Sequence, residues 1–191
     1  VADAQVTIEE LTEALQDYSV DQTYAQEIIQ YRQDWELEVD RIYQYNNQPM
    51  PSQGEVIGAI NTFSDPEDII VCAAGSMPGD LHKLWRTRNA KGFHLEYGYS
   101  CMGYEIAGGL GVKMADPNRE VFVLVGDASY LMMAQEIVTS IQESYKLIII
   151  LVNNDGHASI NGLSNATGAQ GYGTRFLFRR DETGQIDGER L

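Results

Sequence analysis

Two short polar pairs, each placed directly after a run of strand-forming residues, constrain the fold more than any other feature of this chain. Gly126-Asp127 follows the apolar run 121–125, and Asn153-Asn154 follows the apolar run 147–152. The segment 130–143 between the pairs has the length of a helix, so the order is strand, turn, helix, strand, turn. This order predicts an α/β fold in which a parallel sheet is flanked by helices and joined by right-handed crossovers.

The two polar pairs also predict a ligand site. Asp127 and Asn154 are expected at the carboxyl ends of two parallel strands, where open α/β sheets bind ligands. Carboxylate and amide oxygens are hard donors that suit a Mg²⁺ ion also held by phosphates. The backbone amides of Ala128 and Ser129 would then face a phosphate from a helix N-terminus. Asp127 alone fits an ordinary N-cap equally well, and it is the combination with Asn153-Asn154 that favours a Mg²⁺–diphosphate site.

The rest of the chain continues the alternation of strands and helices. Ser52 is a candidate N-cap for a helix that ends near Phe63, and a buried strand is expected over 69–73. Glycine-rich loops follow at 75–79 and 97–103, and the second of them opens a helix over 103–114. Because 155–180 is rich in Gly, Ser, Asn and Thr, we expect a long loop over the site.

Residues 1–46 are predicted to be the helical end of a preceding domain together with its linker. Apolar positions over 22–45 recur at spacings of three and four, which predicts one amphipathic helix. The segment 46–51, Asn-Asn-Gln-Pro-Met-Pro, breaks this pattern and marks a boundary. A second domain is expected over 47–191. We expect the chain to be cut at both ends, with the second domain incomplete at its C-terminus.

Composition narrows the classes of protein and of partner. The net charge is −15, and within 1–40 eleven Asp and Glu face a single Arg, so nucleic acid is not an expected partner. No apolar run approaches the roughly 18 residues of a membrane span, and the first residues do not resemble a signal peptide. Cys72 and Cys101 form no zinc or redox spacing. We therefore expect a cytoplasmic protein with no membrane partner.

With its Gly-Asp and Asn-Asn pairs at this spacing, the chain resembles the C-terminal, diphosphate-binding domain of thiamine diphosphate (ThDP) enzymes. The resemblance implies the ThDP-binding fold. It also implies that Asp127, Asn154 and the backbone carbonyl of Gly156 bind Mg²⁺, which anchors the diphosphate of the cofactor ThDP.

The same resemblance implies direct contacts with the cofactor. Met102 is similar to the bulky residue that holds ThDP bent, and the Ser100 carbonyl is similar to the one that accepts from the aminopyrimidine. A Met near a helix start ordinarily fills a core, and its position ahead of a glycine-rich helix is what favours the cofactor contact. The implied cofactor-binding residues are Gly75, Ser76, Ser100, Met102, Gly126, Ala128 and Ser129.

Three stretches, 73–82, 96–105 and 162–164, are similar to one branch of the superfamily, the ring-opening hydrolases of trihydroxycyclohexane-1,2-dione in myo-inositol breakdown. This resemblance implies hydrolytic cleavage of a carbon–carbon bond in a polyol-derived cyclic diketone, giving 5-deoxyglucuronate. It also implies a homodimer or homotetramer. Acetolactate-synthase-like carboligases and 2-oxoacid decarboxylases would carry the same metal site, so they remain alternatives.

ThDP enzymes use an activating glutamate from the pyrimidine-binding domain of a neighbouring subunit, and this sequence contains no such domain. No glutamate of this chain is assigned that role, so we expect the chain alone to be inactive. His157 closely follows Asn154 and Gly156, two of the implied Mg²⁺ ligands, and either contacts substrate or makes a local hydrogen bond. No other catalytic residue is assigned. A structural assembly domain and a non-catalytic nucleotide-binding module remain as alternatives, although the module's Gly-x-Gly-x-x-Gly and Walker patterns are missing.

Overall fold

The computed structural model describes residues 2–188, and the chain divides into two compact units, 1–41 and 42–191. The first unit contains α1 (Ala4–Ala14) and most of α2 (Gln22–Tyr43). Asp3 caps α1, since its side chain accepts a hydrogen bond from the backbone N–H of Val6. The predicted helix over 22–45 is present as α2. Whether this unit is the end of a preceding domain stays a prediction.

The second unit is built on a parallel sheet of four strands in the order β2-β1-β3-β4. The strands are β1 (Ile69–Cys72), β2 (Phe93–Leu95), β3 (Val121–Gly126) and β4 (Ile148–Val152). Adjacent strands are all parallel. The predicted parallel α/β fold is therefore confirmed, and the chain moves to opposite sides of β1 when it forms β2 and then β3.

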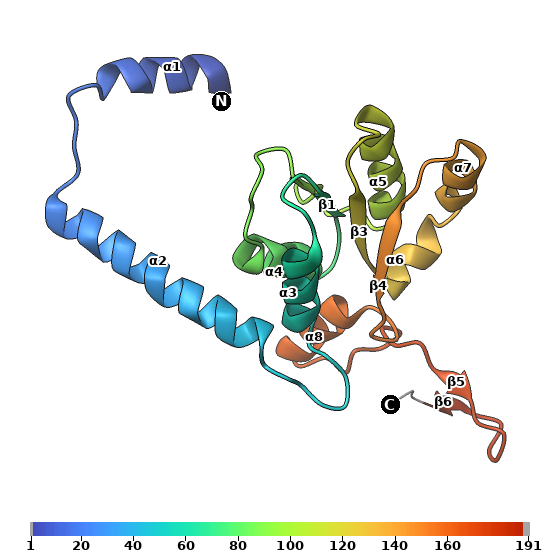
Figure 1. Ribbon diagram of the computed structural model, residues 1–191. Coiled ribbons are helices and arrows are strands. Elements are labelled where there is room, and N and C mark those ends of the chain that lie inside the picture. The colour runs from blue at the N-terminus through green and yellow to red at the C-terminus, as the bar shows by residue number, and fades with distance from the viewer. Residues whose placement is uncertain (1, 189–191) are drawn as a thin grey trace. The chain divides into compact units, whose positions relative to one another are not determined.

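Helices cover both faces of this sheet (Figure 1). On one face, α5 (Tyr104–Ala115) and α7 (Glu136–Gln142) pack over alternate strand residues such as Val71, Val121 and Val123, which are fully buried. Strand residues alternate between faces, so Leu124 faces the other side, with α3 (Gln53–Phe63) and α4 (Met77–Leu84). Burial on both faces explains why the strands are continuous apolar runs.

The second unit begins at Ile42, five residues before the boundary that we expected at 46/47. The last turn of α2 packs within this unit, because the Tyr43 hydroxyl donates to the carbonyl of Leu84. The predicted Ser52 cap of α3 is confirmed. Its hydroxyl accepts from the Glu55 N–H while the Glu55 carboxylate accepts from the Ser52 N–H, which completes a capping box.

The predicted helix over 130–143 is wrong in its bounds. The structure has two short helices there, α6 (Asp127–Met132) and α7, separated at Met133 (φ −141°, ψ 42°). The interruption lets Met133 pack over Gly103, where an added Cβ would lie 2.4 Å from the Met133 Cγ. Packing with another segment therefore overrides the local pattern.

The predicted long loop over 155–180 is also wrong in part, because it contains α8 (Ala158–Ala166). The Asn161 side-chain oxygen accepts from the Thr174 hydroxyl at 2.8 Å, so α8 is attached to the chain that follows it. Beyond it, β5 (Phe178–Arg179) and β6 (Ile186–Gly188) form a separate antiparallel pair. No helix within 2–188 has both the length and the apolarity needed to cross a membrane.

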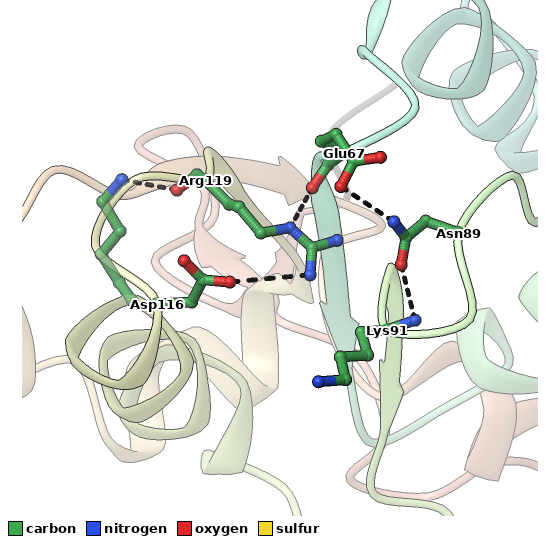
Figure 2. A network of polar contacts seen from close by, with 6 residues as sticks. Glu67, Asn89, Lys91, Asp116 and Arg119 are labelled. Atoms are coloured by element: carbon green, nitrogen blue, oxygen red, sulfur yellow. Dashed lines mark hydrogen bonds and ion pairs between the residues drawn. The ribbon is translucent and has the colours of Figure 1, made fainter.

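A polar network ties together the segments just ahead of β1, β2 and β3 (Figure 2). Arg119, just ahead of β3, donates through Nε to the carbonyl of Glu67, just ahead of β1, and pairs with Asp116 at 3.8 Å. The Glu67 carboxylate accepts from Asn89 at 2.9 Å, and the Asn89 side chain accepts from the Lys91 N–H at 2.8 Å. The network lies at the edge of the sheet opposite to the predicted ligand site.

Replacing Arg119 with Met is expected to lower the free energy of unfolding by about 1–2 kcal/mol, because it removes a charge-assisted hydrogen bond that holds β3 to β1. Urea denaturation would measure this. Arg180→Met is the control, since the Arg180–Asp187 pair is about half exposed (50% and 52%) and such pairs contribute less than about 1 kcal/mol. An equal loss in both variants would contradict the proposed role of the network.

Candidate cofactor site

A cavity of about 200 Å³ lies at the carboxyl ends of β1 and β3, between the two strands from which the chain turns in opposite directions. Open parallel sheets bind ligands at this switch point. Every site residue predicted from the sequence lines this cavity. They are Gly75, Ser76, Ser100, Met102, Gly126, Asp127, Ala128, Ser129, Asn154, Gly156 and His157.

Asp127 is the residue of the cavity whose surroundings point most directly to a bound metal ion. It begins α6 directly after β3 and is only 8% exposed. Its Oδ2 atom accepts a hydrogen bond from the Gly156 N–H at 2.9 Å. Its Oδ1 atom is buried and has no hydrogen-bond partner among residues 2–188. A buried carboxylate oxygen without a partner is costly, so this atom fits a metal ligand.

The other polar groups nearby also fit Mg²⁺. Asn154 lines the same cavity, and Gly156 is held next to Asp127 by the hydrogen bond to Oδ2. Within the described residues there is no cluster of three or more His, Cys, Asp or Glu side chains that would suit a transition metal. One carboxylate, one amide and a backbone carbonyl, completed by phosphate oxygens, is the oxygen donor set that Mg²⁺ favours.

Gly156 has a conformation that the sequence alone did not reveal. Its φ is +145°, and an added Cβ would lie 2.4 Å from the carbonyl oxygen of Thr174. The segment pairs closely with the returning chain: the His157 N–H donates to the Thr174 carbonyl at 2.8 Å, and the Phe176 N–H donates to the Asp155 carbonyl at 2.7 Å. This pairing fixes the loop after β4 against the cavity.

Three helices begin at the cavity wall. The lining includes Ser76 and Met77 at the start of α4, Ala128 in the first turn of α6, and Ala158 and Ser159 at the start of α8. Helix N-termini carry free N–H groups and a partial positive charge, so they favour anions. An anion such as a diphosphate therefore fits a cavity that also offers a Mg²⁺ ligand.

Another part of the cavity lining is the turn that carries Ser100 and Met102. Met102 is half-buried and precedes Gly103, which has a φ of +90° and is the N-cap of α5. Ser100 also has a positive φ, of 53°. The turn is stabilised by Glu96, whose carboxylate accepts from the Cys101 N–H at 2.7 Å and from the Tyr99 N–H at 3.1 Å.

The two N–H donors, first Cys101 and then Tyr99, hold the pKa of the Glu96 carboxyl below its usual value. A group whose pKa is lowered by folding stabilises the fold above its unfolded pKa of about 4.3, and this contribution is lost as the pH falls through the folded value. We expect Glu96→Gln to be less stable than the wild type at pH 7, with the difference closing below about pH 4. Urea denaturation at pH 7 and pH 3.5 would measure it, and a difference independent of pH would contradict the prediction.

Two polar residues at the cavity were not found from the sequence. Gln53, in the first turn of α3, lines the cavity and accepts from the Ser76 hydroxyl at 3.3 Å. Glu105 is fully buried and binds Ala74, Gly103 and Ser129, the first and last of which line the cavity. Neither belongs to a local pattern that points to the cavity, because Gln53 lies there through the packing of α3 and Glu105 only bonds residues of the lining. The only signal for Glu105 is a carboxylate in the first turn of a helix whose other residues, apart from Lys113 near its end, carry no charge.

His157 is half-buried at the cavity wall, next to Gly156. Its ring packs edge-on against Phe176, with the ring centres 5.8 Å apart. Its backbone N–H makes the local hydrogen bond to Thr174. The backbone therefore has the structural role, and contact of the imidazole with substrate stays a prediction.

Residues 73–185, which include every residue of the cavity wall except Gln53, match the family described as "Thiamine pyrophosphate enzyme, C-terminal TPP binding domain". The chain belongs to the ThDP enzyme family. The family resemblance inferred from the sequence motifs is therefore confirmed, and the match favours a ThDP site over a nucleotide-binding module.

Known members of the ThDP family are similar to nearly the whole chain. The 3D-(3,5/4)-trihydroxycyclohexane-1,2-dione hydrolase of Geobacillus thermodenitrificans (strain NG80-2) is 42% identical over 98% of this chain and 33% of its own length. The proteins of the same name from Bacillus cereus (strain AH820) and Bacillus thuringiensis (strain Al Hakam) are each 39% identical over the same shares. This ThDP-family chain thus spans about a third of the length of the relatives it matches.

Proposed function

We propose that this chain is the diphosphate-binding part of a ThDP- and Mg²⁺-dependent enzyme that opens the ring of trihydroxycyclohexane-1,2-dione by hydrolytic carbon–carbon cleavage, giving 5-deoxyglucuronate in inositol catabolism. The observation that carries the proposal is the buried Asp127 Oδ1, which lacks a hydrogen-bond partner among the described residues and lines a cavity bordered by helix N-termini. The substrate follows from the names of the relatives, at 39–42% identity.

Each group of residues has a defined task in this proposal. Asp127, Asn154 and the Gly156 carbonyl would hold Mg²⁺, and the starts of α4 and α6 would offset part of the negative charge of the diphosphate. Met102 would support the cofactor from the turn that it shares with Ser100. When bound, ThDP supplies a nucleophilic carbon and an electron sink for cleaving a bond next to a carbonyl. The protein supplies orientation and the electrostatic environment.

The proposal extends to the assembly. The activating glutamate would come from the pyrimidine-binding domain of a neighbouring subunit, so a homodimer or homotetramer is the functional unit. The chain alone would then be inactive. We place the enzyme in the cytoplasm, with no nucleic-acid or membrane partner.

Calorimetric titration of ThDP into the complete protein, with and without Mg²⁺, tests the cofactor. Binding that requires Mg²⁺ supports the proposal, and absence of binding overturns it. The substrate is tested by comparing turnover of trihydroxycyclohexane-1,2-dione with turnover of pyruvate. Ring opening of the diketone supports a hydrolase. Formation of acetolactate or carbon dioxide from pyruvate, without ring opening, would instead identify a carboligase or a decarboxylase.

A further inference from the structure

Glu105 is a carboxylate in the first turn of α5 that has no exposed surface. Its Oε1 atom accepts from the Ala74 N–H at 3.1 Å. Its Oε2 atom accepts from the Gly103 N–H at 3.1 Å and from the Ser129 hydroxyl at 2.7 Å. The Ser129 oxygen also accepts from the Gly103 N–H at 2.7 Å, so the four groups form one connected network.

The three partners of Glu105 come from three different walls of the cofactor cavity. Ala74 follows β1 and leads into Gly75, Gly103 follows Met102, and Ser129 lies in α6 two residues after Asp127. Glu105 itself does not line the cavity, so it is not placed to contact a ligand there. Its hydrogen bonds instead fix how far these walls lie from one another.

The buried position of this carboxylate needs a reason beyond packing. A charged group without solvent is costly unless its oxygens are fully hydrogen-bonded, and an apolar residue of similar size would avoid that cost. Burial, and next the nearby charge of Glu105, raise the pKa of the Cys72 thiol to about 12. Cys72 therefore stays neutral. Glu105 is the acceptor for the backbone N–H groups of Ala74 and Gly103.

We propose that Glu105 is a positioning residue that sets the spacing between the wall of Gly75, the wall of Met102 and the metal-binding start of α6. The inference rests on the proposed function, since it concerns the same cofactor cavity. Its role differs from that of the activating glutamate of ThDP enzymes, because Glu105 acts through the cavity walls.

Glu105→Gln tests the inference with little change of shape. An amide has one acceptor oxygen, so in either orientation its NH₂ group faces a backbone N–H, that of Ala74 or that of Gly103. At least one wall then loses its hydrogen bond. We expect the dissociation constant for ThDP with Mg²⁺ to rise about 10-fold or more. Calorimetric titration of the complete protein measures it.

Lys113→Met is the matched control, because Lys113 lies at the other end of α5. It is 7% exposed, and its Nζ donates to the Arg119 carbonyl at 2.6 Å, away from the cavity. Both substitutions replace a buried charged residue of the same helix, so both are expected to lower stability in urea denaturation. Only Glu105→Gln is expected to weaken cofactor binding, and Lys113→Met should stay within about 2-fold of the wild type.

Glu105→Asp provides the second variant, since it keeps the charge but is too short to reach all three donors. If Glu105→Gln does not fold, the affinity of Glu105→Asp decides. Weaker cofactor binding in either folded Glu105 variant, with normal binding in Lys113→Met, supports the inference. Wild-type affinity in the folded Glu105 variants overturns the inference alone. Failure of the wild type to bind ThDP overturns the proposed function as well, so the two failures are distinguishable.

Discussion

Replacing Asp127 with Asn is expected to abolish Mg²⁺-dependent binding of ThDP. The substitution keeps the shape of the side chain, and its amide oxygen can still accept from the Gly156 N–H. It removes the charge on the buried oxygen that has no partner among residues 2–188. Loss of one member of a buried charge pair costs about 3–5 kcal/mol, which corresponds to at least about 100-fold in the dissociation constant.

In the metal-free protein, Asp127→Asn is not expected to lower stability. Because the unpaired carboxylate oxygen is costly in the absence of metal, Asp127→Asn should leave the free energy of unfolding unchanged or raise it. Calorimetric titration with and without Mg²⁺, together with urea denaturation in a chelator, measures both effects. Loss of binding with retained stability would identify a residue kept for function.

Asp155→Asn is the control for charge alone. Asp155 lies in the loop after β4, between Asn154 and Gly156 and outside the lining of the cavity, and has a φ of 56°, which Asn tolerates. It should bind ThDP with nearly wild-type affinity and keep the requirement for Mg²⁺. If Asp127→Asn retained Mg²⁺-dependent binding, or if both variants lost it equally, Asp127 would not be the metal ligand.

Gly156→Ala is expected to lower both the free energy of unfolding and the affinity for the cofactor, an effect second only to that of Asp127→Asn. At φ +145° a side chain is strained, and the added Cβ would lie 2.4 Å from the Thr174 oxygen and 2.9 Å from the Arg175 Cα. Both neighbours are backbone atoms that cannot rotate away. We expect a loss of about 2–4 kcal/mol in the free energy of unfolding. Cofactor binding should weaken too, since the loop that positions Gly156 against Asp127 must move.

The same substitution at Gly162 is the control. Gly162 lies in α8, and an added Cβ would meet nothing within 4 Å. Ala is favoured over Gly in a helix by about 1 kcal/mol, so Gly162→Ala should leave stability unchanged or raise it. Urea denaturation and ThDP titration of both variants give the comparison. Equal behaviour of the two variants would show that the backbone of Gly156 is not under the constraint we describe.

The sequence by itself was enough to predict the parallel sheet and the edge of the sheet at which the motif residues meet. Apolar runs such as 121–125 are continuous because the sheet is covered on both faces, and the residues after them, Asp127 and Asn154, are placed by the direction of the strands. These are local properties of the chain, with a period or an order that the residues themselves carry. The motif residues therefore gather at one cavity as expected.

Only the tertiary structure decided how the cavity is held in shape. Met133 ends α6 early because it packs over Gly103, and Thr174 helps to hold α8 within a segment that reads as a loop. Likewise, two of the three partners of Glu105, Ala74 and Ser129, lie 31 and 24 positions away in sequence. The physical reason is that these contacts join segments distant in sequence. Their energies depend on distances and burial that no local pattern of residues encodes.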